Sequence, residues 1–315
     1  MYRKAFLKTA LGVAVGLANV LSSASAFAQA QYDGSAAKPL RVILVPADGG
    51  TEDGTKKDFQ PIFGAITQAT GLSFDIKVGQ SYSAVVEAMC NGAADIAWYG
   101  PASYLQAKAR GCAELLALAV RQGESVYYSG IFARVDSGIS SIADLKGKRI
   151  ALGDVNSTSS FAIPVAMMMA GGVDPVRQAG ALNMTGSHAN VLKALAEGLV
   201  DAGGASFDSF EKAVNAKALD PSKVKVIAKS APIPYPPLAI HPKVNDGVKA
   251  KLRDAFNNID KLPGIGKEQI RGYGGGKVDG YTAKLSEVDM AAAGKMFELV
   301  TDAVKTDIMK KASAR

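Results

Sequence analysis

Residues 153–161 read GDVNSTSSF and place three consecutive hydroxyl side chains between two apolar segments. These side chains belong to Ser157, Thr158 and Ser159. The apolar run at residues 149–152 is typical of a buried strand, and the apolar residues from 161 to 170 predict a helix. A helix start exposes up to four backbone N–H groups and the positive end of the helix dipole. Hydroxyl groups added to such a start make a site that can hold a tetrahedral oxyanion without a metal or a lysine.

Pro164 fits a helix start at this position. Proline lacks an N–H group and is tolerated in the first turn of a helix. Its place in the sequence predicts an N-cap at Ser159 or Ser160. The same residues also fit an ordinary capping segment that binds no ligand, so the run alone leaves both interpretations open.

Residues 1–28 have the pattern of a secretory signal peptide. Basic residues at positions 3, 4 and 8 precede an apolar stretch at residues 10–21, and an A-x-A motif ends at Ala28. The apolar stretch is too short to span a membrane comfortably, and no later segment is as long. We therefore expect an exported, periplasmic protein without a membrane span.

The mature chain would carry a mild positive charge. Three of the 36 Lys and Arg residues lie in the leader, which holds no acidic residue, so 33 basic residues face 29 acidic ones. Such an excess suits a surface that handles anions. The basic residues are scattered along the chain and form no stripe of the kind that binds nucleic acid, so we expect no nucleic-acid partner.

Strand and helix patterns alternate along the chain and then restart after residue 142. This alternation is typical of mostly parallel sheets covered by helices. Extended crossings near residues 127–133 and 232–238 predict a two-lobed α/β fold with two hinges and a ligand cleft between the lobes. The expected lobes are residues 29–131 with 237–315, and residues 132–236. Helices are expected in the tail at residues 246–260 and 286–311.

The chain has two cysteines, Cys90 and Cys112. Both fall at the C-terminal ends of expected helices that flank one strand, so both should lie near the same edge of a sheet. Disulfides persist in exported proteins. The pattern therefore fits a Cys90–Cys112 disulfide, with two buried free thiols as the alternative.

Several motifs together resemble one protein family. They are Trp98-Tyr99-Gly100-Pro101, Asn156-Ser157-Thr158-Ser159 and Gly186-Ser187-His188, with Asp95 ahead of the first and Val200-Asp201-Ala202-Gly203 after the last. In this order they resemble the phosphonate- and phosphite-binding (PhnD-type) components of ABC transporters, over essentially the whole mature chain. The resemblance implies a type II periplasmic binding protein fold that closes on a phosphorus oxyanion and delivers it to a permease in the inner membrane. It implies no cofactor and no catalysis, and we expect a monomer.

The resemblance also assigns roles to residues. Those that would contact the ligand are Ser157, Thr158, Ser159, His188, Tyr99 and Tyr82. The three hydroxyl residues would donate hydrogen bonds to the phosphoryl oxygens, and the histidine would contact the same group. The two tyrosines would reach the ligand from the opposite lobe, although each, like the histidine, also fits a role in packing.

Two positions depart from the family pattern. Its aminoethylphosphonate binders hold the ligand amine with a Glu after the strand at residues 200–204 and an Asp in the proline-rich crossing. Here that crossing carries Tyr235 between prolines and no acid, and the first acid after the strand is the shorter Asp208. Tyr235 fits packing as well as ligand contact, and Asp208 is expected to be the N-cap of its helix, with contact to the cleft as a second role. A cleft of this composition suits phosphite, methylphosphonate or phosphate.

Other functions fit the sequence less well. A serine hydrolase is conceivable, but the chain has no G-x-S-x-G motif and no sequence-evident acid to orient His188. The other histidine, His241, is too distant in sequence to make a metal cluster with it. A sulfate or sulfonate binder would keep the fold, since an imidazole can donate or accept a hydrogen bond. Residues 274–277 (GGGK) lack the spacing of a phosphate-binding P-loop and are expected to form a flexible turn.

Overall fold

The computed structural model describes residues 33–47, 52–284 and 286–314. The expected signal peptide lies outside these residues. Among the helices described, none combines the length and the apolar character needed to cross a membrane.

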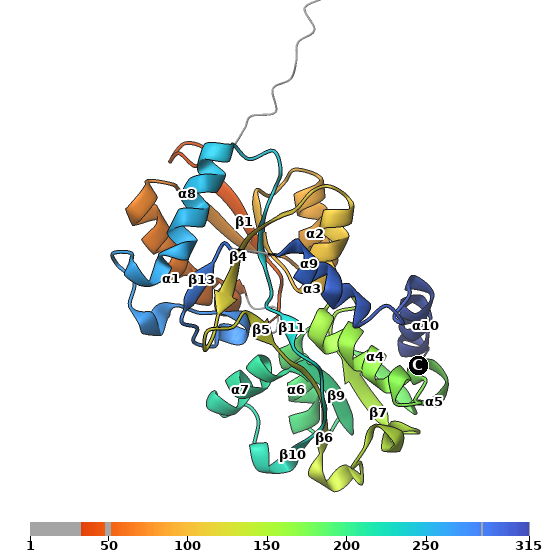
Figure 1. Ribbon diagram of the computed structural model, residues 1–315. Coiled ribbons are helices and arrows are strands. Elements are labelled where there is room, and N and C mark those ends of the chain that lie inside the picture. Colours follow the sequence, from red (N-terminus) through yellow and green to blue (C-terminus); the bar gives the residue numbers. More distant parts are fainter. Residues whose placement is uncertain (1–32, 48–51, 285, 315) are drawn as a thin grey trace, which may run out of the picture. The chain divides into compact units, whose positions relative to one another are not determined.

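A six-stranded sheet forms the centre of the first lobe (Figure 1). Its strands, in spatial order, are β13 (Gly280–Thr282), β4 (Glu114–Val120), β12 (Leu238–Ile240), β3 (Ile96–Trp98), β1 (Leu40–Leu44) and β2 (Phe74–Val78). Strand β1 pairs in parallel with β2 and β3, whereas β12 runs antiparallel to both of its neighbours, β3 and β4. Strand β3 is buried along its whole length, so its C-terminal end delivers the following residue, Tyr99, to the interior.

A five-stranded sheet forms the centre of the second lobe and follows the same plan. Its strands, in spatial order, are β10 (Val224–Lys229), β6 (Ser129–Arg134), β9 (Ala202–Ser206), β7 (Arg149–Leu152) and β8 (Ala181–Met184). Strand β6 runs antiparallel to β9 and β10, as β12 does between its neighbours in the first lobe. In open α/β sheets the loops at the carboxyl ends of the parallel strands carry the ligand.

Helices cover both sheets. The first lobe carries α1 (Glu52–Thr70), α2 (Tyr82–Cys90), α3 (Pro101–Ala109), α8 (Asp246–Asn257) and α9 (Glu287–Lys295). The second carries α4 (Ile163–Ala170), α5 (Pro175–Gln178), α6 (His188–Ala196), α7 (Phe207–Asn215) and α10 (Asp302–Ser313). Short helical turns are η1 (Val135–Ser137), η2 (Ile142–Leu145), η3 (Thr158–Ala162), η4 (Pro221–Lys223), η5 (Ile259–Lys261), η6 (Lys267–Gln269) and η7 (Tyr273–Gly275).

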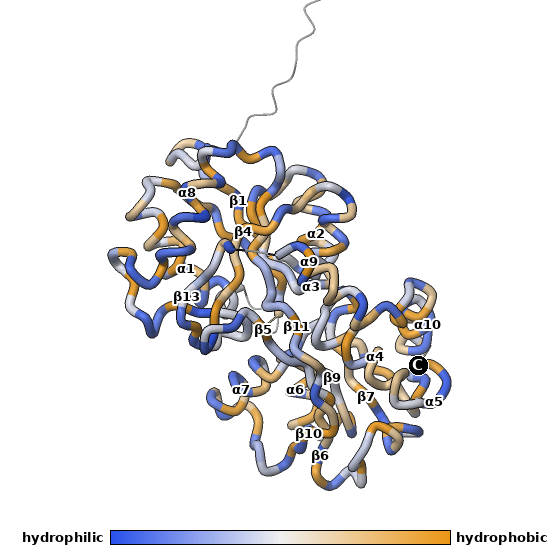
Figure 2. Tube along the Cα trace, in the orientation of Figure 1, coloured by the Kyte–Doolittle hydropathy of each residue, from blue (hydrophilic) through white to orange (hydrophobic). Residues whose placement is uncertain are grey.

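Small residues in β9 let two helices approach the second sheet closely. Hydrophobic and hydrophilic stretches alternate along the helices that surround it (Figure 2). A Cβ atom at Gly203 would lie 2.6 Å from Val191 on α6, and a Cβ atom at Gly204 would lie 2.5 Å from Pro164 on α4. Consecutive residues of a strand face opposite sides of the sheet. The two glycines therefore allow α4, which follows the hydroxyl run, and α6, which begins at His188, to pack closely against opposite faces of the sheet.

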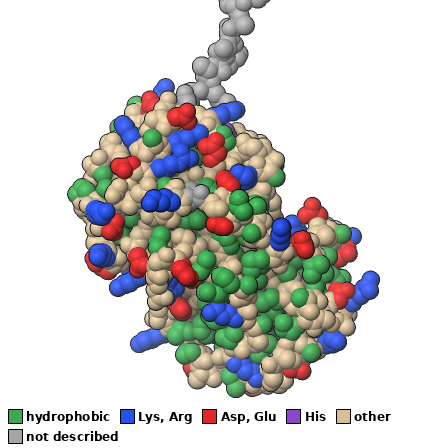
Figure 3. Space-filling view, in the orientation of Figure 1, with side chains coloured by type: hydrophobic (Ala, Val, Ile, Leu, Met, Phe, Trp, Pro, Cys, Tyr) green, Lys and Arg blue, Asp and Glu red, His purple; other side chains and the backbone are tan. Residues whose placement is uncertain are grey.

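Charged side chains are distributed over both lobes. On the face seen in Figure 3, Lys and Arg side chains are spread out and lie among acidic ones. Many are ion-paired, as in Arg41–Asp95 and Arg149–Asp201, each with a nitrogen–oxygen distance of 2.7 Å. The visible face shows no continuous basic stripe.

A short pair of strands links the lobes. Strands β5 (Val126–Tyr127) and β11 (Ile233–Pro234) pair antiparallel between the two sheets (Figure 1). The backbone N–H of Tyr235 donates to the carbonyl of Ser125 over 2.8 Å and extends this pairing. The proline-rich crossing is thereby held in an extended conformation.

The C-terminal segment differs from its expected structure. Residues 286–311 form two helices, because Thr301 caps the start of α10 by accepting a hydrogen bond from the N–H of Val304. Helix α10 packs against β8 and α5, and its Ile308 is buried in the hydrophobic core of the second lobe. This helix therefore lies with the second lobe, although the sequence placed all of residues 237–315 with the first.

The structure pairs Cys90 with Cys112 in a disulfide, which confirms the first of the two alternatives. The bond joins the last residue of α2 to the segment just before β4. The disulfide therefore links the chain before β3 to the chain after α3, and Tyr99 lies in the segment between them.

Candidate functional site

The hydroxyl run begins its helix earlier than expected. Ser157 is the N-cap, because its side chain accepts a hydrogen bond from the N–H of Ser160 over 3.2 Å. The next five residues form the π-helical turn η3, in which the N–H of Ala162 bonds to the carbonyl of Ser157 over 3.0 Å. The expected N-cap at Ser159 or Ser160 was wrong by two or three residues.

Pro164 explains the wider turn. Since proline has no N–H, the carbonyl groups of the preceding turn need other partners. The carbonyl of Ser159 accepts from the hydroxyl of Ser129 over 2.8 Å, and that of Ser160 accepts from the N–H of Gly153 over 3.0 Å. These bonds satisfy the turn and tie it to β6 and β7.

The three hydroxyl groups of the run are buried and have different partners. Ser157 Oγ accepts from the hydroxyl of Ser160 over 2.8 Å and lies 3.4 Å from His188 Nε2. Thr158 Oγ1 accepts from the N–H of Ala102, at the start of α3, over 2.8 Å. Ser159 Oγ has no hydrogen-bond partner among the described residues, so this hydroxyl is able to donate to a ligand.

His188 is a neutral hydrogen-bond donor. It is the first residue of α6, and its Nδ1 accepts from the backbone N–H of Ser206 over 3.0 Å. Since a backbone N–H can only donate, the ring proton must lie on Nε2. Complete burial lowers the pKa of His188 to about 3. Nε2 lies between Ser157 Oγ and the hydroxyl of Tyr273.

Tyr99 and Tyr82 lie at the ends of elements in the first lobe and are fully buried. Tyr99 follows β3, and its N–H donates to the carbonyl of Pro237 over 3.0 Å. Its hydroxyl has no hydrogen-bond partner among the described residues, and burial raises its pKa. Tyr82 begins α2, and its N–H donates over 3.2 Å to the carboxylate of Asp154 in the second lobe. Tyr82 thus lies at a contact between the lobes.

Asp208 is buried beside a cation from the chain itself. Its Oδ1 lies 3.1 Å from Arg121 Nη1 and 3.5 Å from the hydroxyl of Tyr235. Burial raises the pKa of Asp208 to about 6, and the positive charge of Arg121 acts in the opposite direction. The N-cap of α7 is Ser206 and not Asp208 as expected, since the Ser206 side chain accepts from the N–H of Ser209 over 3.1 Å.

Sequence reasoning missed two tyrosines at this site. The ring centroid of Tyr273 lies 5.4 Å from those of His188, Trp98 and Tyr127. Burial raises the pKa of Tyr127, and the nearby hydroxyls of Ser159 and Thr158 act in the opposite direction. Tyr273 directly precedes the glycine run read as a flexible turn, and Tyr127 lies in a crossing read only as a hinge. No periodicity or motif marks either residue as part of a site.

Hydrogen bonds join the two lobes around these residues. Gln106 Nε2 donates to Asn156 Oδ1 over 2.9 Å, and the backbone N–H of His188 donates to the carbonyl of Ala47 over 3.3 Å. Lys212 Nζ lies 3.0 Å from Asp58 Oδ2. Together with the Tyr82–Asp154 and Ala102–Thr158 bonds, these contacts describe a closed arrangement of the lobes.

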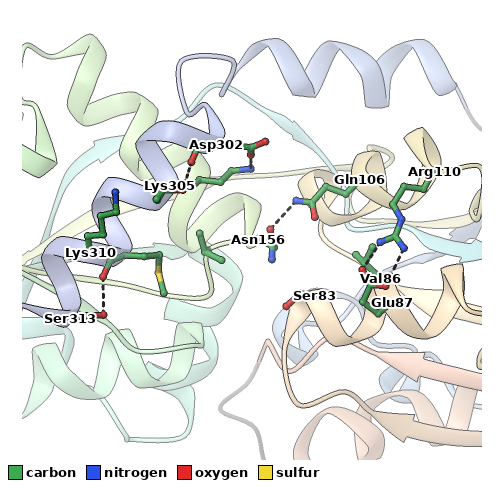
Figure 4. A pocket seen from close by; sticks show the side chains of 13 residues that line it. Ser83, Val86, Glu87, Gln106, Arg110, Asn156, Asp302, Lys305, Lys310 and Ser313 are labelled. Carbon is green, nitrogen blue, oxygen red and sulfur yellow. Dashed lines mark hydrogen bonds and ion pairs between the residues drawn. The ribbon is translucent and has the colours of Figure 1, made fainter.

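A surface groove of about 810 Å³ lies beside this closure (Figure 4). Asn156 and Gln106 meet in it, and α10 forms its other wall. Its charged side chains are paired, Arg110 with Glu87 and Lys305 with Asp302. The groove is therefore distinct from the buried hydroxyl and histidine cluster, none of whose side chains line it.

Comparison with known proteins adds to this geometry. A family model described as "ABC transporter, phosphonate, periplasmic substrate-binding protein" matches residues 19–281. The phosphonates-binding periplasmic protein of Escherichia coli (strain K12) is 27% identical over 218 residues, which are 68% of this chain and 64% of that protein. The phosphate-import protein PhnD of Mycolicibacterium smegmatis is 28% identical over 228 residues, 69% of this chain and 70% of that protein. The match to the E. coli protein thus spans less than two thirds of its length.

Solved structures share the fold. The binding protein component of an ABC phosphonate transporter from Pseudomonas aeruginosa has a TM-score of 0.69 at 23% identity, covering 86% of this chain and 98% of that one. PhnD1 from Prochlorococcus marinus, solved in complex with methylphosphonate, has a TM-score of 0.72 at 18% identity, covering 84% of this chain and 98% of that one. These likenesses confirm the expected two-lobed α/β fold.

Proposed function

The chain belongs to the family of phosphonate periplasmic substrate-binding proteins of ABC transporters, and from this premise we propose that it captures a small phosphorus oxyanion between its lobes. The mature protein would then deliver the anion to a permease in the inner membrane. The proposed ligand contacts are Ser157, Thr158, Ser159, His188, Tyr99 and Tyr82, with Asp208 and Tyr235 at the edge of the site.

The observation that carries this proposal is a buried set of neutral hydrogen-bond donors. Ser159 and Tyr99 come from opposite lobes, and the hydroxyl of neither has a partner among the described residues. His188 adds an Nε2–H group whose orientation is set by Ser206. Hydrogen bonds to a charged acceptor are stronger than neutral ones, and more so in a dry site. Such a set favours an anion over a neutral or cationic ligand.

The pairing of Asp208 supports a ligand without an amine. A buried carboxylate could attract an ammonium group, but Arg121 already lies 3.1 Å from this one. The hydroxyl of Tyr235 also points to the same oxygen. We infer that phosphite, methylphosphonate and phosphate bind more tightly than aminoethylphosphonate.

Capture would proceed by closure of the lobes. In an open state the anion would first meet the hydroxyl run and His188, and the tyrosines of the first lobe would then cover it. The loop that holds Asp154, Asn156 and Thr158 makes direct hydrogen bonds to α2 and α3. A ligand favours closure only through its greater affinity for the closed state, so contacts from both lobes are required.

The geometry around His188 supports binding rather than catalysis. In a serine hydrolase the histidine accepts the serine proton and is oriented by a carboxylate. Here the nitrogen that faces Ser157 carries the proton, and the other nitrogen accepts from a backbone N–H. We therefore expect no turnover of a phosphate ester.

A sulfate or sulfonate binder is the second candidate. The protonated Nε2 cannot accept a hydrogen bond from a ligand O–H group, and a fully deprotonated anion such as sulfate needs only donors. Direct competition between sulfate and methylphosphonate decides between the two candidates.

A thermal-shift panel on the purified mature protein tests the proposal. The panel contains phosphite, methylphosphonate, phosphate, aminoethylphosphonate and sulfate, each at several concentrations. A bound ligand raises the melting temperature with its occupancy, and we expect this for the first three. The variant His188→Ala serves as the control with a reduced response. No rise with any phosphorus oxyanion contradicts the proposal, and the largest rise with sulfate supports the second candidate.

We also propose export to the periplasm with removal of residues 1–28. Mass spectrometry of the protein released from the periplasm should give a chain that begins at Gln29. A full-length chain retained in the cytoplasm contradicts this part of the proposal.

A further inference from the structure

Thr55 carries a buried hydroxyl with no hydrogen-bond partner among the described residues. It is the fourth residue of α1, and only 1% of its surface is exposed. The hydroxyl of Tyr99 and the Oγ of Ser159 share this condition. Those two belong to the proposed ligand site. Tyr99 directly follows β3, and Ser159 lies in η3. Buried polar groups are nearly always hydrogen-bonded, so each exception calls for a partner.

Other threonines of the same helix behave differently. Thr67 Oγ1 donates to the carbonyl of Phe63 over 3.0 Å, and Thr70 Oγ1 donates to that of Ile66 over 2.6 Å. This bond to the carbonyl four residues earlier is the usual way in which a helical threonine satisfies its hydroxyl. Thr55 Oγ1 has no such partner among the described residues, and Thr55 is more deeply buried than either of the other two threonines.

The neighbours of Thr55 on α1 face the proposed ligand site. Residues three and four positions apart lie on one face of a helix, so Thr55 shares a face with Asp58 and Phe59. The ring of Phe59 lies 4.8 Å from that of Trp98, the residue before Tyr99. Asp58 pairs with Lys212 on α7, the helix that carries Asp208 in its first turn.

Two further contacts place the start of α1 near His188. A Cβ atom added to Gly275 in η7, the turn that begins at Tyr273, would come within 2.6 Å of Asp58 Oδ2. The carbonyl of Ala47, five residues before the helix, accepts the backbone N–H of His188. Side chains of a helix lean toward its N-terminus, so Thr55 points from the Asp58–Phe59 face toward this end.

We propose that Thr55 is a further ligand-binding residue and donates its hydroxyl to an oxygen of the bound oxyanion. The inference rests on the proposed function and deepens it. Thr55 would add a donor at the positive end of the long helix α1, where an anion is favoured. With Tyr99 it gives the first lobe two hydroxyl donors opposite the Ser157–Ser159 run. That arrangement provides the contacts from both lobes that closure needs.

Substitution of Thr55 tests the inference. Thr55→Val keeps the branched shape and removes the hydroxyl, Thr55→Ser keeps the hydroxyl, and Thr67→Val is the matched control on the exposed part of the same helix. Calorimetric titrations with phosphite, methylphosphonate and phosphate give Kd, and thermal melts without ligand give stability. Loss of a hydrogen bond to a charged group predicts a Kd about tenfold to hundredfold higher for Thr55→Val. Thr55→Ser and Thr67→Val should keep the wild-type Kd within about threefold.

The melts separate this role from a structural one. Removing a buried, unpaired hydroxyl leaves the melting temperature of the unliganded protein unchanged or higher, whereas loss of a structural hydrogen bond lowers it. Thr55→Ala provides a second measurement if Thr55→Val does not fold. A wild-type Kd in Thr55→Val overturns the inference while the proposed function stands. Absence of binding by the wild-type protein overturns both.

Discussion

The buried carboxylate of Asp208 makes the stability of the protein depend on pH in a direction that can be calculated. Burial raises its pKa from the ordinary 3.8 to about 6. Between these two values the folded protein holds a proton that the unfolded chain releases. Stability therefore falls as the pH rises through this window, and the loss is complete above the folded pKa. At 1.36 kcal/mol per pKa unit, a shift of about two units corresponds to about 3 kcal/mol.

The substitution Asp208→Asn removes the ionisation and keeps the shape of the side chain. The variant should match the wild type near pH 4, where the carboxyl group is protonated. At pH 7.5 its free energy of unfolding should exceed that of the wild type by up to about 3 kcal/mol. Urea unfolding of the unliganded protein at pH 4, 5, 6 and 7.5, followed by the fluorescence of Trp98, measures the difference.

Glu211→Gln is the matched control for this experiment. Glu211 also pairs with Arg121, at 3.1 Å, but its side chain is 53% exposed. Its replacement should keep most of the pH dependence of the wild type, because burial is the largest cause of the raised pKa of Asp208 and the charge of Glu211 adds less to it. If the free energy of unfolding changes with pH in the same way in Asp208→Asn and in the wild type, burial does not raise the pKa of Asp208.

Three further predictions concern the proposed site. Ser159→Ala should raise the melting temperature without ligand and weaken oxyanion binding by about tenfold or more, because it removes a buried unpaired hydroxyl; calorimetry showing an unchanged Kd speaks against a ligand role. For His188, whose pKa is lowered to about 3, stability should fall as the pH drops from 6.5, since the unfolded chain takes up a proton that the folded one refuses. The pH dependence of oxyanion affinity should follow the protonation of the ligand alone, and an additional step near pH 6.5 contradicts the neutral Nε2–H form. Tyr273→Phe removes the hydroxyl next to His188 Nε2 and should raise the Kd severalfold with little change in melting temperature; a large loss of stability instead identifies a packing role.

Local sequence patterns predicted most of the secondary structure and the two-sheet plan. The run at residues 149–152 forms β7 as expected, and the apolar residues from 161 to 170 are helical, in η3 and α4. These elements are controlled by short-range periodicity, which a single sequence displays. The same reasoning placed both cysteines at one edge of a sheet and left open whether they form a disulfide, which the structure shows.

Features that depend on partners distant in the sequence were not predictable. Pro164 has no N–H to donate to the carbonyls of the π-helical turn that follows Ser157. Ser129 and Gly153 donate hydrogen bonds to these carbonyls instead. The ion pair between Arg121 and Asp208 joins the chain across 87 residues. Tyr273 lies beside His188 because η7 packs against α7 and α1. Each of these contacts is set by tertiary packing, for which local propensity carries no signal.

Calorimetric titration of methylphosphonate into the mature protein and into the double variant Ser159→Ala/His188→Ala shows whether the hydroxyl run and His188 bind the oxyanion. Both side chains are buried donors of the second lobe, and neither forms an ion pair with any residue that the structure describes. We expect saturable binding of one methylphosphonate per wild-type chain and no measurable heat of binding for a double variant that remains folded. Equal affinity in the two proteins would contradict the claim that the hydroxyl run and His188 form the oxyanion site.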